Sequence, residues 1–220
     1  NDRIIGAERK EAAEYTKIIY EAMVKGGTCY ITDDITAEMC KLVENTFRDV
    51  NIAFANELSV ICDKLNINVF ELIKLATKHP RVNILAPGAG VGGHCLAVDP
   101  WFIVEKFPKE ANVIREARLI NDFKPRFIVN KIDEILQGNK ELTVGVLGLA
   151  YKPDIDDLRE SPAMEIAEIL RDKGYKVIAC EPNVNKEEVD GFELFPLEEI
   201  LKKADYLVLA QGHKIFKENI

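Results

Sequence analysis

The sequence contains no run of basic residues, and its overall charge is acidic. Lys and Arg number 29 against 37 Asp and Glu, which gives a formal net charge of -8. A chain of this kind is a poor candidate for binding nucleic acid or an anionic membrane. An anionic ligand would therefore have to be met by a few well-placed cations rather than by a broad positive surface.

Paired cysteines and long apolar runs are also missing. The five cysteines are odd in number and scattered without a C-x-x-C pair, and the three histidines lie far apart. This pattern excludes a disulfide framework and predicts no metal site. Free thiols are typical of a reducing compartment, so the pattern predicts a cytoplasmic protein. No apolar run approaches the roughly 18 residues that a membrane-spanning helix needs.

The apolar pattern changes its period along the chain, and this predicts three parts. Residues 1–34 have the pattern strand, helix, strand, and residues 35–138 are predicted to be almost entirely helical. Residues 139–220 alternate strands with helices, and the strands are LTVGVLGLA, YKVIACEP and DYLVLAQ. Such alternation predicts an α/β fold with a parallel, doubly wound, Rossmann-like sheet. Within it, Ser161, Pro162 and Gly174 are predicted to begin and end one helix.

A long helix opens the helical part, with Thr36 as its expected N-cap. An average helix has about three turns, whereas apolar residues at steps of three and four trace one stripe over about eight turns here. This length predicts a helix that spans domains or forms a two-fold homodimer; the alternative is a core helix within one subunit. The stripe consists of Val43, Phe47, Val50, Phe54, Leu58, Ile61 and Leu65. Two separate helices are predicted further on, one from about Lys109 and one over roughly 125–137.

The stretch GAGVGGHC, residues 88–95, contains the pattern G-x-G-x-x-G. A true dinucleotide fingerprint joins a strand to a helix. RVNILA upstream could be extended, but Pro100 argues against a helix start downstream, and no β-α-β unit follows. The stretch is therefore predicted to be a loop in which glycines let a ligand approach the backbone closely. The candidate ligand-binding glycines are Gly88, Gly90, Gly92 and Gly93.

The residue that ends this stretch is Cys95. Most free cysteines are small buried hydrophobes, and that interpretation is favoured for the other four, at positions 29, 40, 62 and 180. A glycine turn is a poor place to bury a side chain, so the buried interpretation is not favoured for Cys95.

Three long motifs carry a family resemblance. GVGGHCLAVDPWF, preceded by HPRVNILAPG, is similar to the catalytic-cysteine segment of the UDP-glucose/GDP-mannose dehydrogenases. AEMCKLVENTFRDVNIAFANEL resembles the family's central helix, and GLAYKPDIDDLRESPAMEI resembles the signature of its nucleotide-sugar-binding domain. The resemblance implies an NAD-dependent, four-electron oxidation at C6 of a UDP-sugar, through a thiohemiacetal and a thioester on Cys95. Residues 97–99 are Ala-Val-Asp rather than Pro-Lys-Asp, which is more similar to members that act on UDP-N-acetyl-D-mannosamine than on UDP-glucose.

The resemblance also implies three further catalytic residues. Lys41 and Asn45 are i, i+4 neighbours on one face of the long helix, where a cation and an amide could stabilise an oxyanion. The alternative for this pair is a solvated helix face. Asp99 follows Cys95 by four residues and could activate the hydrolytic water or hold a lysine; the alternative is a turn residue before Pro100.

Three cations are the candidates for ligand binding by resemblance. Lys152 is expected to contact the UDP-sugar, and Arg159 is expected to contact the NAD cofactor. The alternative for Arg159 is an ion pair with Asp156 or Asp157 on a surface turn. Arg81 is expected to reach the substrate across a subunit interface.

The resemblance implies that residues 1–34 are the last β-α-β piece of an NAD-binding domain, and that the C-terminal domain lacks its final elements. We therefore expect the 220-residue chain to be inactive by itself. Two alternatives stay open. One is a sibling enzyme for UDP-N-acetylglucosamine, UDP-glucose or GDP-mannose, and the other is a non-catalytic, dimeric module that binds nucleotide sugars.

Overall fold

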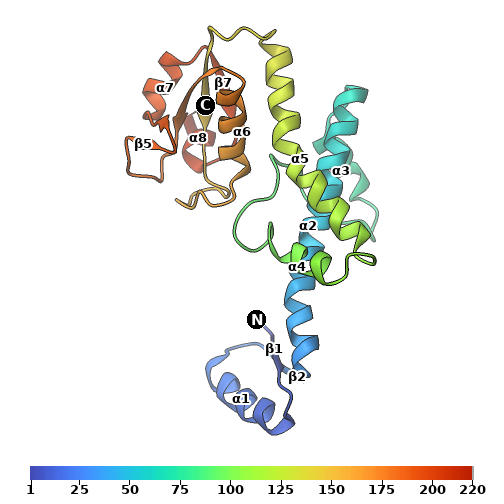
Figure 1. The fold of residues 1–220 in the computed structure, drawn as a ribbon. Coiled ribbons are helices and arrows are strands. Elements are labelled where there is room, and N and C mark those ends of the chain that lie inside the picture. Colours follow the sequence, from blue (N-terminus) through green and yellow to red (C-terminus); the bar gives the residue numbers. More distant parts are fainter. Residues whose placement is uncertain (220) are drawn as a thin grey trace.

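A computed structural model describes residues 1–219 and has three parts in the order that the sequence predicts (Figure 1). A β-α-β unit lies at one end and an α/β domain at the other, with a group of helices between them. The long helix α2 (Asp34–Leu65) runs from the β-α-β unit into the helical middle. None of the helices in residues 1–219 has the length and apolar character needed to cross a membrane.

The β-α-β unit is small. Strands β1 (Arg3–Gly6) and β2 (Cys29–Thr32) pair in parallel and are connected by helix α1 (Lys10–Met23). Their core is formed by Ile5, Ala13 and Cys29, while the outer face of α1 leaves Tyr15 71% and Ile18 64% exposed. The predicted strand, helix and strand are confirmed.

Helix α2 has 32 residues and begins earlier than expected, because its N-cap is Asp33 rather than Thr36. The Asp33 carboxylate accepts hydrogen bonds from the Thr36 amide at 2.8 Å and from its hydroxyl at 2.7 Å. Asp and Thr both cap helices well, so the sequence allowed either start. The helix ends at Asn66, which adopts the left-handed conformation with φ 54°.

The buried face of α2 carries polar and small side chains, and the apolar stripe points outward. Phe47 is 65% exposed, Phe54 49% and Leu65 63%. Within residues 1–219 most of the stripe is therefore not part of the core, and both the dimer and the single-subunit alternative stay predictions. The residues of α2 that are buried include Asn45, Thr46, Asp49, Ala53, Ala55 and Asn56.

The other helices of the middle part are α3 (Val69–Ala76), α4 (Asp99–Lys106) and α5 (Asn112–Ile135). The prediction of two helices in the α5 region was wrong, because Pro125 lies inside one continuous helix. Proline cannot donate the amide hydrogen that the carbonyl four residues earlier, here that of Asn121, would accept. Gly90 packs there, since a Cβ at Gly90 would lie 3.1 Å from the Asn121 carbonyl oxygen.

The C-terminal domain contains a parallel sheet in the order β4-β3-β7, formed by β3 (Thr143–Leu147), β4 (Lys176–Cys180) and β7 (Tyr206–Leu209). Helix α6 (Pro162–Asp172) connects β3 to β4, and α7 (Leu197–Lys203) precedes β7. The two helices cover opposite faces (Figure 1). On one face Val144 and Val146 pack with α6, and on the other Leu147 packs with Ile200 of α7.

The predicted doubly wound α/β fold is thus confirmed. Ser161 caps α6 by accepting from the Met164 amide at 3.4 Å, with Pro162 in the first turn, and Gly174 with φ +89° follows the helix end. Helix α8 (Lys214–Asn219) completes the described chain. A short antiparallel hairpin was not predicted; its strands β5 (Glu188–Val189) and β6 (Phe192–Glu193) have two residues each.

Candidate functional site

The loop between α3 and α4 carries Cys95, and it contains no strand. The G-x-G-x-x-G stretch therefore does not join a strand to a helix, and the prediction that it is not a dinucleotide fingerprint holds. One reason given for that prediction was wrong. Pro100 does not prevent a helix start, because it lies in the first turn of α4, where a proline is favoured.

Three of the four loop glycines pack directly on the C-terminal domain. A Cβ at Gly92 would lie 2.3 Å from the Glu160 carbonyl oxygen, and one at Gly93, whose φ is +85°, would lie 2.7 Å from the Tyr151 ring. A Cβ at Gly90 would lie 3.1 Å from the side chain of Pro162. Gly88 faces open space, with its nearest neighbour at 3.9 Å. The glycines therefore have a packing role, and contact with a substrate stays a prediction.

Cys95 lies in the turn that begins α4. Its carbonyl accepts hydrogen bonds from the amides of Val98 at 3.1 Å and Asp99 at 2.8 Å. The side chain is half-buried, and no disulfide engages it. This backbone turn fixes the position of Asp99 relative to Cys95, four residues apart, at the helix start.

Lys41, Asn45 and Asp99 form one chain of hydrogen bonds. The side-chain amide of Asn45 donates to the Asp99 carboxylate at 2.5 Å. The Lys41 ammonium donates to the side-chain carbonyl oxygen of Asn45 at 3.4 Å. Asn45 is only 4% exposed, whereas the Lys41 side chain is 65% exposed and also lies 3.8 Å from Glu44. The structure thus brings three of the predicted catalytic residues together beside the turn of Cys95.

Arg159 forms an ion pair with Asp157, as the alternative for this residue anticipated. The two hydrogen bonds are 2.9 Å and 2.7 Å long. They lower the pKa of Asp157 to about 2 and raise the pKa of Arg159. The turn lies close to the cysteine loop, because a Cβ at Gly92 would lie 2.3 Å from the carbonyl oxygen of Glu160, the residue after Arg159. Arg159 remains 66% exposed at its side chain, and its contact with a cofactor stays a prediction.

The other two predicted ligand-binding cations lie on the surface. Lys152 and Arg81 are exposed, and neither side chain has a hydrogen-bond or ion-pair partner within residues 1–219. Lys152 follows the end of β3, near the turn that meets the cysteine loop, whereas Arg81 follows α3. Their roles stay predictions.

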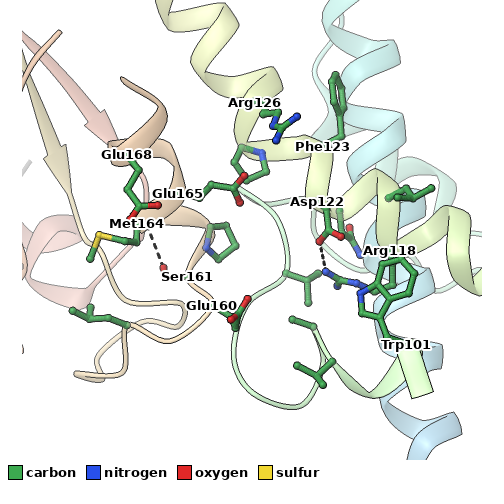
Figure 2. Close-up of a pocket in the computed structure, with 18 of the residues that line it drawn as sticks. Trp101, Arg118, Asp122, Phe123, Arg126, Glu160, Ser161, Met164, Glu165 and Glu168 are labelled. Carbon is green, nitrogen blue, oxygen red and sulfur yellow. Dashed lines mark hydrogen bonds and ion pairs between the residues drawn. The ribbon is translucent and has the colours of Figure 1, made fainter. Parts of the chain in front are cut away.

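A cavity of about 880 Å³ lies between α5 and α6, and residues of the cysteine loop form part of its wall (Figure 2). Cys95 does not line it. Arg118 and Arg126 are its cations, and burial raises the pKa of two of its acids, Asp122 and Glu165. An acidic cavity disfavours an anionic nucleotide sugar. The acids that line the cavity are Asp122, Glu160, Glu165, Glu168 and Asp190.

The carboxyl end of the C-terminal sheet is closed by the chain's own side chains. Glu181 follows β4 and accepts hydrogen bonds from the amides of Leu149 at 2.7 Å and Ala150 at 3.0 Å. His213, which is fully buried, lies 3.1 Å from the same carboxylate. A dinucleotide would need such free amides at this point, so these residues do not fit one. Sequence reasoning missed Glu181, although an acid directly after a strand was a visible signal.

A second group that sequence reasoning missed lies between α2 and α5. Asp49, Asn56, Arg118 and Asn121 are each at most 2% exposed and bonded to one another. The available signal was the density of polar residues in RDVNIAFANEL, inside a helix with an apolar stripe.

Comparison with known proteins agrees with this geometry. The central domain of the UDP-glucose/GDP-mannose dehydrogenase family matches residues 35–123, and the UDP binding domain of the same family matches residues 145–220. UDP-N-acetyl-D-mannosamine dehydrogenase of Campylobacter jejuni is 50% identical over 99% of this chain and 55% of its own length. NDP-N-acetyl-D-galactosaminuronic acid dehydrogenase of Ralstonia nicotianae is 49% identical over 99% of this chain and 52% of its own.

Among solved structures, UDP-D-ManNAc dehydrogenase from Pyrococcus horikoshii superposes with a TM-score of 0.91 at 42% identity. The superposition covers 99% of this chain and 51% of that one. The chain thus spans about half the length of the relatives it matches. With both of its matched domains in order and its fold shared with solved members, the chain belongs to the UDP-glucose/GDP-mannose dehydrogenase family.

Proposed function

We propose that this chain supplies the thiol side of the active site of an NAD-dependent dehydrogenase that oxidises C6 of UDP-N-acetyl-D-mannosamine to the carboxylate. The observation that carries the proposal is the bonded group of Lys41, Asn45 and Asp99 beside the turn of Cys95. A nucleophile, an oxyanion-stabilising cation and amide, and a carboxylate are the parts that this chemistry needs.

In the proposed reaction the C6 alcohol is first oxidised to an aldehyde. The Cys95 sulfur then adds to the aldehyde carbon, forming a C–S bond, and the carbonyl oxygen becomes an alkoxide that takes a proton. Loss of a hydride from C6 and of the proton from the hydroxyl re-forms the C=O bond and gives a thioester. Water adds to this thioester, the C–S bond breaks, and the acid and the free thiol are released.

Lys41 and Asn45 would stabilise the negative oxygen that develops when sulfur or water adds to the carbonyl carbon. Asp99 would accept a proton from the attacking water. The 2.5 Å hydrogen bond from the Asn45 side-chain amide to the Asp99 carboxylate supports these roles, because it fixes the orientation of both groups.

NAD would accept the two hydrides. Residues 1–219 form no dinucleotide cradle, since the glycine loop packs on Tyr151 and Glu160 and the amides of Leu149 and Ala150 are taken by Glu181. We propose that the cofactor is held mainly by the part of the relatives' length that this chain does not span, with Arg159 as a contact. It follows that residues 1–220 alone should not turn over.

The UDP-sugar class is supported by the match to the UDP binding domain, and the mannosamine sugar by the names of the relatives. A second candidate substrate has its own support. A relative of equal similarity is named for N-acetyl-D-galactosaminuronic acid, so the configuration of the sugar is open to test. Initial rates with a panel of UDP-sugars separate the two, and equal rates for both would contradict a mannosamine enzyme.

We also propose a homodimer formed through α2 and a cytoplasmic location. The exposed apolar stripe with Phe47 and Phe54 supports the first, because a closed symmetric interface would cover it. The five free thiols support the second.

The experiment that tests the function uses a protein of the relatives' full length that carries these residues. NADH formation is followed by absorbance with UDP-N-acetyl-D-mannosamine, in the parent and in Cys95→Ala. The proposal expects two NADH per sugar in the parent and at most one in the variant, whose reaction stops before the thioester; two NADH per sugar in both would show that Cys95 has no catalytic part.

A further inference from the structure

A chain of buried polar side chains connects the ion pair between α2 and α5 to the cysteine loop. Arg118 donates to Asp49 at 2.6 Å and also to Asp122. Asn121 donates its side-chain amide to Asp49 at 2.8 Å. The side-chain amide of Asn56 then donates to the side-chain carbonyl oxygen of Asn121 at 2.9 Å.

The last member of this chain holds the loop backbone. The carbonyl oxygen of the Asn56 side chain accepts the Gly88 amide at 2.8 Å. Gly88 opens the G-A-G-V-G-G-H-C stretch that ends at Cys95. Asn51, on the same helix, accepts the Leu85 amide at 3.0 Å and donates to the Asn83 carbonyl at 3.3 Å. The loop is therefore held by side chains of α2 rather than by strand pairing.

The two ends of this chain set the direction of its bonds. Asn121 donates its side-chain amide to two acceptors of Asp49, the carboxylate at 2.8 Å and the backbone carbonyl at 3.1 Å. The Asn121 side-chain oxygen therefore faces Asn56, which turns its NH₂ group toward Asn121 and its oxygen toward the Gly88 amide, a group that only donates. Loss of the Asp49 carboxylate removes one of the two acceptors that hold Asn121 and so weakens this arrangement.

The buried ions make this arrangement costly. Asp49 is fully buried and Arg118 is 2% exposed. Within the described residues the Asp49 Oδ2 and Arg118 Nε atoms have no partner. Apolar side chains of similar volume often stabilise a protein as well as a buried ion pair does. The orientation that this ion pair gives to the side chains bonded to it therefore explains the pair better than stability does.

We propose that Asp49, Asn121 and Asn56 are positioning residues that fix the loop carrying Cys95 in its reactive conformation. The inference rests on the proposed function, since it assigns these residues to the same thiol site. They touch neither Cys95 nor the ligand, and they act through the Gly88 backbone.

The test uses Asp49→Asn, which removes the charged acceptor at one end of the chain, and Asn56→Leu, which removes the bond to Gly88. Asn56→Ser is the milder variant if Asn56→Leu does not fold. Val129→Ala is the matched control, because Val129 is fully buried on α5 in the sheet core and its apolar side chain makes no hydrogen bond to the loop. Each variant is compared with the parent at a temperature where all are folded.

Two readouts are measured. The first, on the 220-residue chain, is the rate of Cys95 alkylation by iodoacetamide, together with hydrogen exchange of the Gly88 amide. We expect a loosened loop to raise both rates about tenfold in the Asp49 and Asn56 variants, since local opening exposes the thiol and the amide. The second, in a full-length protein, is kcat, which we expect to fall about tenfold because the nucleophile is misplaced.

Val129→Ala should lower the melting temperature while leaving the alkylation and exchange rates within about twofold of the parent. The inference is overturned if the Asp49 and Asn56 variants behave like Val129→Ala in both rates, since their role is then structural only. Failure of the proposed function is distinguishable, because it would abolish turnover in the parent without changing the alkylation and exchange results.

Discussion

The side-chain amide of Asn45 donates a hydrogen bond of 2.5 Å to the carboxylate of Asp99, 54 residues further along the chain. This bond connects α2 to the first turn of α4, where the Asp99 amide in turn donates to the Cys95 carbonyl at 2.8 Å. The long helix and the cysteine loop are therefore joined by hydrogen bonds, although they come from separate motifs.

Replacing Asn45 by Ala should reduce kcat in a full-length protein by about 100-fold. The variant removes an oxyanion donor, and loss of such donors costs about 10²–10³ in rate. It also leaves Asp99 without its partner. The matched control is Asn112→Ala, an exposed amide at the start of α5 that bonds only to nearby backbone and side chains. Equal losses in both variants would contradict a role for Asn45 in the site.

Cys95 should be alkylated by iodoacetamide, whereas Cys180 should not. Cys180 is 3% exposed, and burial raises the pKa of its thiol to about 11, so little thiolate forms at neutral pH. A UDP-sugar should slow the modification of Cys95 and leave that of the half-buried Cys40 unchanged. Peptide mass spectrometry assigns each site. Protection of both thiols, or of neither, would contradict a ligand seated at Cys95.

Gly92→Ala should destabilise the protein, and Gly88→Ala should not. A Cβ at Gly92 would meet the Glu160 carbonyl oxygen at 2.3 Å, whereas at Gly88 the nearest atom is 3.9 Å away. Overpacking of this kind typically costs about 1–3 kcal/mol. Urea unfolding measures the difference. A raised KM in Gly88→Ala with unchanged stability would assign Gly88 to the substrate contact that the sequence predicts for it.

The order of strands and helices could be predicted because their periods differ, and each of the three parts is found in its predicted place. The errors have local causes. Two helices were predicted where α5 is continuous through Pro125, and Gly90 packs against the backbone carbonyl of Asn121, to which this proline cannot donate. The start of α2 depended on a choice between two residues that both cap well.

The ion pair of Asp157 with Arg159 should make stability depend on pH below about pH 4. The folded pKa of Asp157 is lowered to about 2 by Arg159, while an unfolded aspartate titrates near about 3.9. The stabilisation is therefore complete above the unfolded pKa and is lost as the pH falls through the folded one. Urea unfolding of the parent and of Asp157→Asn should differ most above pH 5 and converge toward pH 2. A difference that stays constant with pH would contradict the pair.

The apolar stripe of α2 should form a dimer interface. Phe47→Glu places a charge where the side chain is 65% exposed in the single chain. Burying an unpaired charge in an interface is costly, so light scattering should give twice the chain mass for the parent and the monomer mass for the variant. Glu57→Gln on the same helix is the control. A monomeric parent would contradict the interface.

Less of the candidate site than of the fold could be predicted from the sequence. The motifs identified Lys41, Asn45, Cys95 and Asp99, and helical spacing placed the first two on one face. The sequence could not show that Asp49 acts through two amides on Gly88, because that chain of bonds joins three separate segments. Nor could it show that the loop glycines pack on Tyr151 and Glu160, since tertiary contacts alone determine what a glycine lies against.

The central claim is that Cys95 carries the sugar through the second oxidation. The most direct measurement is the number of NADH molecules formed per UDP-N-acetyl-D-mannosamine consumed by a full-length protein carrying these residues, with and without Cys95→Ser. The account predicts two NADH per sugar in the parent and no uronic acid product in the variant. Formation of the acid with two NADH per sugar by Cys95→Ser would contradict it.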